Sequence, residues 1–480
     1  MRKTTRRTFL KKSIIGAAGF AAAPFLSQCT TASASPKNVL FIAVDDLRPQ
    51  LNCYGHSQMI SPNIDALAAS GTRFDRTYCQ VPVCGASRAS LLTGVRPARN
   101  RFVGYSTWVD EDLPGALTLP QHFKNNGYHT ISNGKVLHHR TDAIESWSED
   151  PWRPQGEGNW RDYINEQNKV IASQTEGGRG PAFEKAEAPD DAYFDGKIAN
   201  KTIEDLQRLS EMESPFFLAT GFLKPHLPFN APTKYWDMYN FDDLDLADNP
   251  FRPVDAPDAA LHNWGELRNY TNIPREGDLS EEMVRTLVHG YYACTTYTDA
   301  QIGRVLQSLD DLNLRDNTII ILWGDHGWNL GEHGLWCKHC NFETSLHSPM
   351  IISAPGFDSG QSSDALTEFV DIYPTLNELA GLEQPEHLEG TSVVPLMENP
   401  GREWKEAVFS RYHAGDSVKN DRYRYTEWKN DQGEVYANML YDHHKDPAEN
   451  VNIAGHPDNT ELVDTFRGYL ASDWQEFVPE

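Results

Sequence analysis

The stretch Cys84-Gly85-Ala86-Ser87-Arg88-Ala89-Ser90-Leu91-Leu92-Thr93-Gly94 decides how the rest of this 480-residue sequence is interpreted. Residues 73–83, which precede it, predict a strand that runs into a turn marked by Pro82. Residues 87–93 have helical spacing, and Gly94 stands where a helix usually ends. Cys84 would then lie at a helix N-terminus, where free N–H groups and the helix dipole suit an anion, with Arg88 one turn further on and facing it. The alternative interpretation is a buried structural cysteine beside a helix cap.

Composition predicts a globular protein and excludes one class of partner. The hydrophobic content is 39%, typical of a globular protein, and a length of 480 residues suits one large domain plus a smaller one. The formal net charge is −25, and because residues 1–35 carry six basic side chains and no acidic one, the remainder is still more acidic. Such a chain repels nucleic acid, so no nucleic-acid partner is expected. An anionic substrate would need a local cluster of positive groups.

The first 35 residues predict an export signal, which we exclude from the fold. Residues 5–11 resemble a twin-arginine signal, and residues 14–25 form an apolar region that is short for a stable membrane span. Residues 26–29 resemble a lipoprotein cleavage box, although Gln28 is larger than the usual Ala or Gly. We therefore expect an exported protein, periplasmic or anchored as a lipoprotein. Its membrane contact would come only through a lipid on Cys29.

Apolar runs alternate with helical patterns along residues 36–395, which predicts an α/β domain. The expected strands, buried on both faces, are residues 38–44, 128–132, 215–222, 317–323 and 349–354. The expected helices are residues 61–70, 118–126, 195–211, 279–309 and 371–379. From residue 396 to residue 480, short alternating strands (407–412, 422–428 and 435–441) precede a helix at 459–474. We expect this part to be a small α+β subdomain, an antiparallel sheet with a helix on one face.

Polar side chains with catalytic potential follow the carboxyl ends of the expected strands, where open α/β sheets bind ligands. These residues are Asp45, Asp46, Lys135, His138, His226, Asp325 and His326. The three carboxylates favour Ca²⁺ or Mg²⁺ over zinc, and His326 adjoins them as a ligand or a supporting group. Arg88, Lys135 and Lys338 supply positive charge for an anion, and the other two histidines suit proton transfer near neutral pH.

The pattern Cys84-x-Ala86-Ser87-Arg88 with its Leu-Thr-Gly end resembles the signature of the type I sulfatases, which has proline where this chain has Ala86. Longer blocks are similar to the iduronate-2-sulfatase group and its bacterial polysaccharide-sulfatase relatives. They are residues 45–49, 51–55, 61–65, 133–138, 224–229 and 331–338. The resemblance spans residues 38–355, and a weaker similarity is present at residues 440–450. It implies an alkaline-phosphatase-like mixed sheet sandwiched by helices, one Ca²⁺, and removal of sulfate from a sugar.

The resemblance also implies a role for each site residue. Cys84 is oxidised to Cα-formylglycine by a formylglycine-generating enzyme or an anaerobic sulfatase-maturating enzyme, and one hydroxyl of the hydrated aldehyde attacks sulfur. Ca²⁺ is held by Asp45, Asp46, Asp325, His326 and an oxygen of the modified Cys84. Arg88 and the ion lower the pKa of the nucleophile, and Lys135 and Lys338 hold the sulfate oxygens. His226, assisted by Lys338, protonates the departing sugar oxygen. His138 takes the proton from the second hydroxyl, which expels sulfate.

Two alternatives remain open at this stage. The first is a phosphonate monoester hydrolase or phosphodiesterase of the same superfamily, although enzymes with a two-zinc site would need more histidine ligands than these strand ends provide. The second is a glycan-binding lipoprotein in which Cys84 is never oxidised.

The long loops at residues 100–112, 147–192 and 230–278 are expected to recognise a sulfated oligosaccharide. Their aromatic and basic side chains suit sugars and anions, and the candidates are Arg101, Trp108, Trp147, Trp152 and Trp160. Residues 441–445 could add to this surface. Glycosaminoglycans, ulvan, carrageenan and fucoidan all fit, and nothing in the sequence selects among them. Cys337 and Cys340 have CxxC spacing without a second such pair, so we expect a disulfide or two thiols rather than a zinc site.

Overall fold

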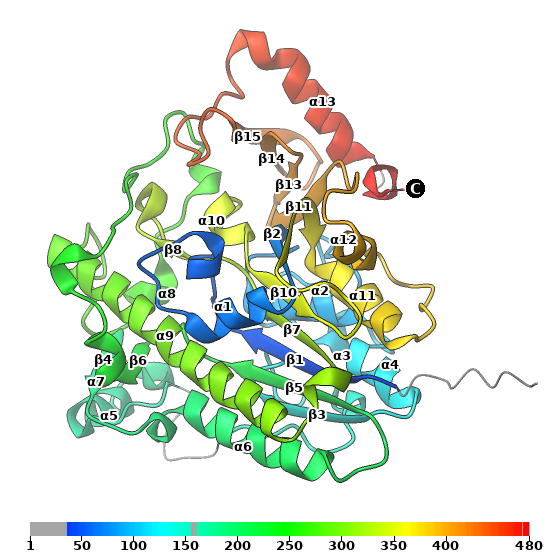
Figure 1. The fold of residues 1–480 in the computed structure, drawn as a ribbon. Helices are drawn as coiled ribbons and strands as arrows, with labels where there is room; N and C mark the ends of the chain where they lie inside the picture. Colours follow the sequence, from blue (N-terminus) through cyan, green and yellow to red (C-terminus); the bar gives the residue numbers. More distant parts are fainter. Residues whose placement is uncertain (1–35, 155–160, 473, 480) are drawn as a thin grey trace, which may run out of the picture. The chain divides into compact units, whose positions relative to one another are not determined.

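A seven-stranded mixed sheet forms the centre of the protein, with strand order β11-β2-β10-β7-β1-β5-β3 (Figure 1). The computed structural model describes residues 36–154, 161–472 and 474–479, so the expected export signal and Cys29 lie outside the described residues. Strand β10 runs antiparallel to both of its neighbours, and every other pairing in the sheet is parallel. The strands are β1 (Asn38–Val44), β2 (Thr72–Tyr78), β3 (His129–Gly134), β5 (Phe216–Phe222), β7 (Thr318–Gly324), β10 (Met350–Ser353) and β11 (Gln361–Glu368).

The central strands consist almost entirely of apolar residues because both faces of the sheet are covered. Along β1, Leu40 and Ile42 pack into one hydrophobic core, and Val39 and Phe41 pack into the core on the opposite face. All seven residues of β1 are buried. The same alternation continues along β7, as expected for a sheet between two helical layers.

Two sets of helices cover the two faces (Figure 1). The first set consists of α1 (Pro62–Ala69), α6 (Phe194–Leu209) and α9 (Glu281–Asp311), and the second of α2 (Cys84–Thr93), α4 (Leu119–Asn125) and α11 (Ile372–Ala380). The helix ends follow local sequence signals. The Ser280 side chain accepts a hydrogen bond from the Met283 N–H at the start of α9. Gly94 adopts a left-handed φ of 67° at the end of α2.

A second sheet follows near the C-terminus, with strand order β12-β13-β14-β15 and antiparallel pairing throughout. Its strands are β12 (Val408–Tyr412), β13 (Gly415–Lys419), β14 (Tyr423–Lys429) and β15 (Val435–Asp442), and α13 (Thr460–Ala471) follows. Val463 and Phe466 of α13 pack against Val418 and Tyr425 in a third core. The predicted fold class is therefore confirmed. Residues Pro36–Glu480 form one compact unit, so the boundary between residues 395 and 396 stays a prediction.

Several elements differ from the sequence prediction because their signals are weak. Strand β11 was not expected because, as an edge strand, it is rich in polar residues, and β13 is short and polar. Strand β2 ends at Tyr78, well before residue 83. The segments expected to be irregular pair with each other through β4 (Phe183–Ala186) and β6 (Phe229–Pro232). The remaining short elements are α3 (Val109–Asp112), α5 (Glu166–Ser173), α7 (Thr233–Trp236), α8 (Gly265–Arg268), α10 (Glu343–Leu346), α12 (Val394–Glu398), β8 (Asn329–Leu330) and β9 (Trp336–Cys337).

The cysteines within the described residues are all free thiols, so Cys337 and Cys340 form no disulfide in this structure. The second of the two expectations for this pair, two plain thiols, is the one that the structure contains. Among the helices in the described ranges, none combines the length and the apolar character that crossing a membrane requires.

The central strand provides a stability prediction. We expect Ile320→Ala in β7 to lower the free energy of unfolding by about 2–5 kcal/mol, because Ile320 is 0% exposed and its loss leaves a cavity. Urea denaturation followed by circular dichroism measures the change. Ile144→Ala is the matched control, since Ile144 is 40% exposed, and should change stability by less than about 0.5 kcal/mol. Equal effects of the two substitutions would contradict the assignment of β7 to the core.

Candidate active site

The site residues predicted from the sequence lie together at one edge of the central sheet. Asp45 and Asp46 follow β1, Asp325 and His326 follow β7, and Lys135 follows β3. Strands β7, β1, β5 and β3 are consecutive neighbours and parallel, so their carboxyl ends meet at this edge. The remaining predicted residues also reach the edge: His138, His226, Cys84, Arg88 and Lys338.

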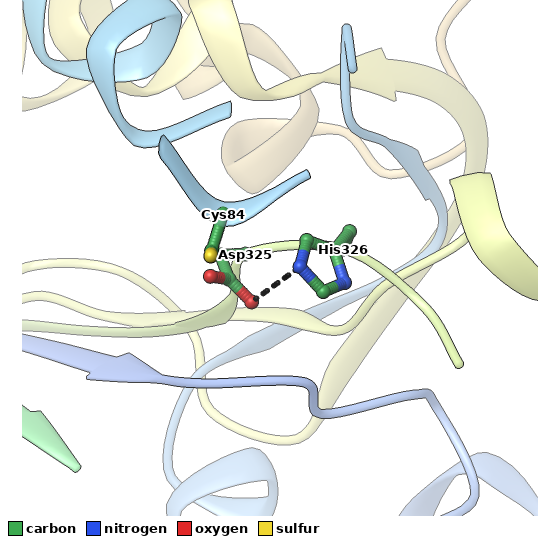
Figure 2. Close-up of side chains that lie close together, drawn as sticks. All are labelled: Cys84, Asp325 and His326. Atoms are coloured by element: carbon green, nitrogen blue, oxygen red, sulfur yellow. Dashed lines mark ion pairs between the residues drawn. The ribbon is translucent and has the colours of Figure 1, made fainter. Parts of the chain in front are cut away.

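Cys84 is the first residue of α2, and its side chain faces the ends of β3 and β7. Its Sγ lies 3.2 Å from His138 Nδ1, and Figure 2 shows the thiol beside Asp325 and His326. Helix α2 is joined to the same edge by the Ser87 hydroxyl, which donates to the Asp325 carbonyl at 2.5 Å. Burial alone would raise the pKa of the Cys84 thiol, but the positive charge of Lys135 and the adjacent His326 ring hold that pKa below its ordinary value.

The fully buried guanidinium of Arg88 joins two of the carboxylates. Its Nε donates to Asp325 Oδ2 at 2.8 Å, and its Nη2 donates to Asp45 Oδ1 at 3.2 Å. Its Nη1 donates to the backbone carbonyls of Lys135 and Val136. Arg88 thereby ties α2 to strands β1, β7 and the loop after β3. Burial by itself would raise the pKa of Asp45, but Lys135, His226 and Arg88 hold it well below its usual range.

The close approach of the ends of β3 and β5 places Lys135 beside Asp45. Lys135 Nζ donates to Asp45 Oδ2, and the Lys135 N–H donates to the Gly221 carbonyl at 2.8 Å. Gly134, at a φ of +73°, would place a Cβ only 2.1 Å from that same carbonyl oxygen. Only glycine fits this position, so Gly134 fixes where the loop with Lys135 and His138 begins.

Asp46 and Lys338 form a further buried ion pair at this edge of the sheet. We call the charged residues at this edge, Asp45, Asp46, Arg88, Lys135, Asp325 and Lys338, the charged floor. Lys338 Nζ lies 3.1 Å and 3.2 Å from the two Asp46 oxygens and 2.9 Å from Glu266 Oε1. Burial would lower the pKa of Lys338, but the two carboxylates raise it well above its usual value, so Lys338 is cationic. Burial, joined by the charges of Asp45 and Glu266, raises the pKa of Asp46 well above its usual value despite His226 and Lys338.

His326 supplies the test of whether a metal ion fits this site. Its Nδ1 lies 2.9 Å from the Gly327 carbonyl oxygen, and because a carbonyl only accepts, Nδ1 carries a proton. The fully buried Nε2 has no hydrogen-bond partner and lies 3.4 Å from Asp46 Oδ1 and 3.6 Å from Asp325 Oδ1. Figure 2 shows this ring beside the Asp325 carboxylate. An unpartnered ring nitrogen that converges with two carboxylate oxygens is a ligand set for a divalent cation, so the residues fit a metal.

His138 lies on the other side of Cys84 and carries no charge. Burial, together with the positive charges of Lys135 and Arg88, lowers the pKa of His138 to about 3. A neutral imidazole within 3.2 Å of the residue-84 side chain can accept a proton from it.

A cavity of about 880 Å³ opens onto this floor, and its wall is basic. Cys84, Lys135, His138, His226 and Lys338 line its base. Further cationic or titratable side chains that line it are Arg153, Arg161, Arg179, His262, His339 and His413. The strongly acidic chain therefore concentrates positive charge where an anion would bind, as the sequence analysis required.

Each of the three long loops expected to recognise the substrate contributes residues to the lining of this cavity. They are residues 103–106 of the first loop, residues 153, 154, 161 and 179 of the second, and residues 262, 263, 265, 266, 269 and 270 of the third. The aromatic side chains named for that role are not among its lining residues. Trp147 is a core residue, Trp108 stacks on His139 with ring centroids 4.1 Å apart, and Tyr441 is fully buried. Arg101 and Trp152 also lie outside the lining, and Trp160 lies outside the described residues.

Two residues of the site were missed by the sequence analysis, Glu266 and Arg153. Arg153 donates to the carbonyls of Gly134, Leu137 and His138, and so supports the loop that carries the catalytic candidates. Glu266 contacts Lys338 and His226. Both lie in segments without periodicity, and no local pattern distinguishes them from other charged residues nearby. The weak signal that did exist was the Gly, Pro and Trp content of those segments.

Comparison with known proteins agrees with this geometry. A family model described as Sulfatase matches residues 37–382, and a model described as N-sulphoglucosamine sulphohydrolase, C-terminal, matches residues 331–475. Iduronate 2-sulfatase of Homo sapiens is 36% identical over 395 residues, 72% of this chain and 70% of the relative. A sulfatase of Formosa agariphila is 32% identical over 435 residues, 87% of this chain and 83% of the relative.

Solved structures share the fold. The phosphonate monoester hydrolase of Agrobacterium radiobacter superposes with a TM-score of 0.74 at 23% identity and covers 91% of this chain and 95% of its own. A protein solved with its substrate D-glucosamine-2-N,6-O-disulfate gives a TM-score of 0.68 at 23% identity, covering 91% and 99%. These likenesses show the fold alone. Because the Sulfatase model matches most of the chain, the protein belongs to the sulfatase family of sulfuric ester hydrolases.

The buried ion pairs of Arg88 provide a second stability prediction. We expect Arg88→Met to lower the free energy of unfolding by about 3–5 kcal/mol, because two buried carboxylates would lose their partner. Arg76→Met is the matched control. Arg76 pairs at 2.6 Å with Asp421, whose side chain is 71% exposed, and this loss should be below about 1 kcal/mol. Chemical denaturation of both variants measures the difference, and similar small losses would show that Arg88 is not a structural tie.

Proposed function

We propose that this protein hydrolyses a sulfate ester of an anionic sugar derived from a polysaccharide, using a formylglycine made from Cys84 and one calcium ion. The observation that carries the proposal is the position of Cys84, within 3.2 Å of a neutral histidine and beside buried carboxylates and cations, at the base of a basic cavity. Asp45, Asp46, Asp325 and His326 would hold the ion together with an oxygen of the modified residue 84. Their hard oxygen ligands favour calcium or magnesium, and the family resemblance favours calcium.

The bound groups supply what the side chains lack: the hydrated aldehyde a nucleophilic hydroxyl, and the ion positive charge that lowers the hydroxyl pKa. Arg88 keeps Asp45 and Asp325 in place. Lys135 and Lys338 bind and orient the sulfate oxygens and stabilise the charge that redistributes in the transition state. His138 accepts a proton at Nδ1 from the residue-84 side chain. His226 donates the proton at Nε2 to the departing sugar oxygen.

Two observations support the substrate class, the positive charge of the cavity wall and the similarity to a named relative. The cavity wall bears Arg153, Arg161 and Arg179 in addition to the sulfate-binding lysines, which suits a sugar from an anionic polymer. The relative that is 36% identical carries the name iduronate 2-sulfatase, which points to a sulfated sugar acid. Glycosaminoglycan, ulvan, carrageenan and fucoidan fragments are therefore the substrates to screen.

The proposal also includes the maturation of Cys84 and the export of the protein. A formylglycine-generating or anaerobic sulfatase-maturating enzyme would convert Cys84, and residues 1–35 would direct export to the periplasm or to a lipid anchor at Cys29. These two parts rest on sequence patterns alone.

Cys84→Ala tests the nucleophile. We expect this variant to lose sulfate release on every substrate of the panel, by at least about 10³-fold, because covalent catalysis ends when the nucleophile is removed. The wild-type protein is coexpressed with a formylglycine-generating enzyme, and the mass of the peptide that contains residue 84 reports its oxidation. The melting temperature should stay close to that of the wild type, since alanine is tolerated at a helix N-terminus. Retained sulfate release would rule out the formylglycine mechanism.

Removal of calcium tests the metal site by a readout independent of activity. We expect the chelator EGTA to lower the melting temperature, and Ca²⁺ at 100 times its Kd to stabilise the folded protein by about 2.7 kcal/mol. Asp46→Asn should weaken the calcium-dependent shift, because it removes a charged ligand. Asp258→Asn is the matched control, since Asp258 lies on the surface in an exposed ion pair with Arg252. A melting temperature that does not respond to calcium would contradict the proposed ion.

A further inference from the structure

Glu266 is the one carboxylate among the described residues that line the basic cavity. We propose that Glu266 is a positioning residue that holds His226 and Lys338 for proton delivery to the leaving sugar. This inference rests on the proposed sulfatase function, and no sequence motif drew attention to the residue. Because a carboxylate repels a sulfate ester, its place beside the anion site is explained by what it does to the two cationic neighbours.

The contacts of His226 show what Glu266 contributes. The ring Nδ1 lies 2.6 Å from the Leu227 carbonyl oxygen, and Nε2 lies 3.1 Å from Glu266 Oε1. A carbonyl and a carboxylate both accept, so the ring donates from both nitrogens and carries a proton on Nε2, the atom that faces the cavity floor. Glu266 fixes the plane of this ring and the direction of its Nε2–H.

The same carboxylate oxygen holds Lys338. Lys338 Nζ lies 2.9 Å from Glu266 Oε1 and 3.1 Å from Asp46 Oδ1, and it sits 4.9 Å from the centre of the Trp328 ring. One oxygen of Glu266 thus links His226, which protonates the leaving oxygen, to Lys338, which binds the sulfate. Its other oxygen, Oε2, is buried without a hydrogen-bond partner and is 3.9 Å from His339 Nδ1.

The backbone around Glu266 is held firmly enough for a positioning role. Glu266 is the second residue of α8, and the next residue, Leu267, is 1% exposed. Arg268 donates to the carbonyls of Asn263, Pro274 and Gly277 at 2.8–2.9 Å, and its guanidinium lies 3.6 Å from the centre of the Trp264 ring. These bonds close the loop from residue 263 to residue 277 on itself, which preorganises the carboxylate.

The proposed step has a defined proton balance. An oxygen of the modified residue 84 would form the new bond to sulfur as the bond between sulfur and the sugar oxygen breaks. The sugar oxygen keeps the electron pair of the broken bond and takes the Nε2 proton of His226, so it leaves as a neutral hydroxyl. His226 is left neutral and regains its proton from water before the next turnover. Protonation matters most for a sugar alkoxide, which is a poor leaving group, and least for a phenolate, which leaves readily without a proton. Loss of Glu266 should therefore affect the two classes of substrate unequally.

The experiment compares Glu266→Gln and Glu266→Asp with the wild type on two sulfate esters. One is 4-nitrophenyl sulfate, and the other is the sugar sulfate that the wild type hydrolyses fastest among disaccharides from heparin, chondroitin sulfate, carrageenan and ulvan. We expect Glu266→Gln to lower kcat on the sugar sulfate by about 100-fold and on the aryl sulfate by less than about tenfold. Glu266→Asp, which keeps the charge, should recover part of the loss. Glu276→Gln, the same change at an exposed position near the end of this loop, should alter neither rate.

Each outcome decides between the possible roles of Glu266. Equal losses on both esters, or a raised KM with an unchanged kcat on the sugar, would overturn the proposal in favour of a structural or sugar-binding role. If Glu266→Gln lowers the melting temperature sharply, the same ratio of rates is measured for Glu266→Asp, and an equal loss there overturns it too. A wild-type protein that is oxidised at residue 84 and releases sulfate from neither ester would instead remove the proposed function, and with it this inference.

Discussion

The structure depends on the neutralisation of buried charge at the edge of the central sheet. Three carboxylates, Asp45, Asp46 and Asp325, follow strands that are buried along their whole length, and none of the three is exposed to solvent. Charges taken out of water at this depth must be paired, or the folded state loses several kcal/mol for each of them. Arg88 forms ion pairs with two of the carboxylates, and the unpartnered Nε2 of His326 lies where a cation could neutralise the remaining charge.

The same buried ion pairs also determine the position of Cys84. Since Arg88 comes from α2, the same ion pairs that stabilise the carboxylates fix the helix whose first residue is Cys84. The charge that stabilises the fold and the charge that would activate the nucleophile are therefore one arrangement. His138 stays neutral on the other side of Cys84 because it is buried and because Lys135 and Arg88 lie near it, which leaves an uncharged imidazole among the cations.

The distribution of charge reconciles an acidic protein with an anionic substrate. A net charge of −25 keeps polyanions away from most of the surface, and the cavity opposes this with lysine and arginine side chains. Glu266 is the exception on that wall. Its negative charge weakens the attraction of the cavity for an anion. Its contacts hold Lys338 and His226 in place, which in our proposal outweighs that loss.

The sequence by itself determined the buried strands, the family signature at Cys84 and the polar residues after each strand. These follow from local rules, because an apolar run predicts a central strand and the carboxyl ends of parallel strands share an edge. Strand β11 and the cavity wall escaped prediction for a physical reason: an edge strand need not be apolar, and loops take their conformation from what they pack against. Only the tertiary structure brought Glu266 and Arg153 to the site. Their positions depend on contacts between segments far apart in the chain, which no local pattern records.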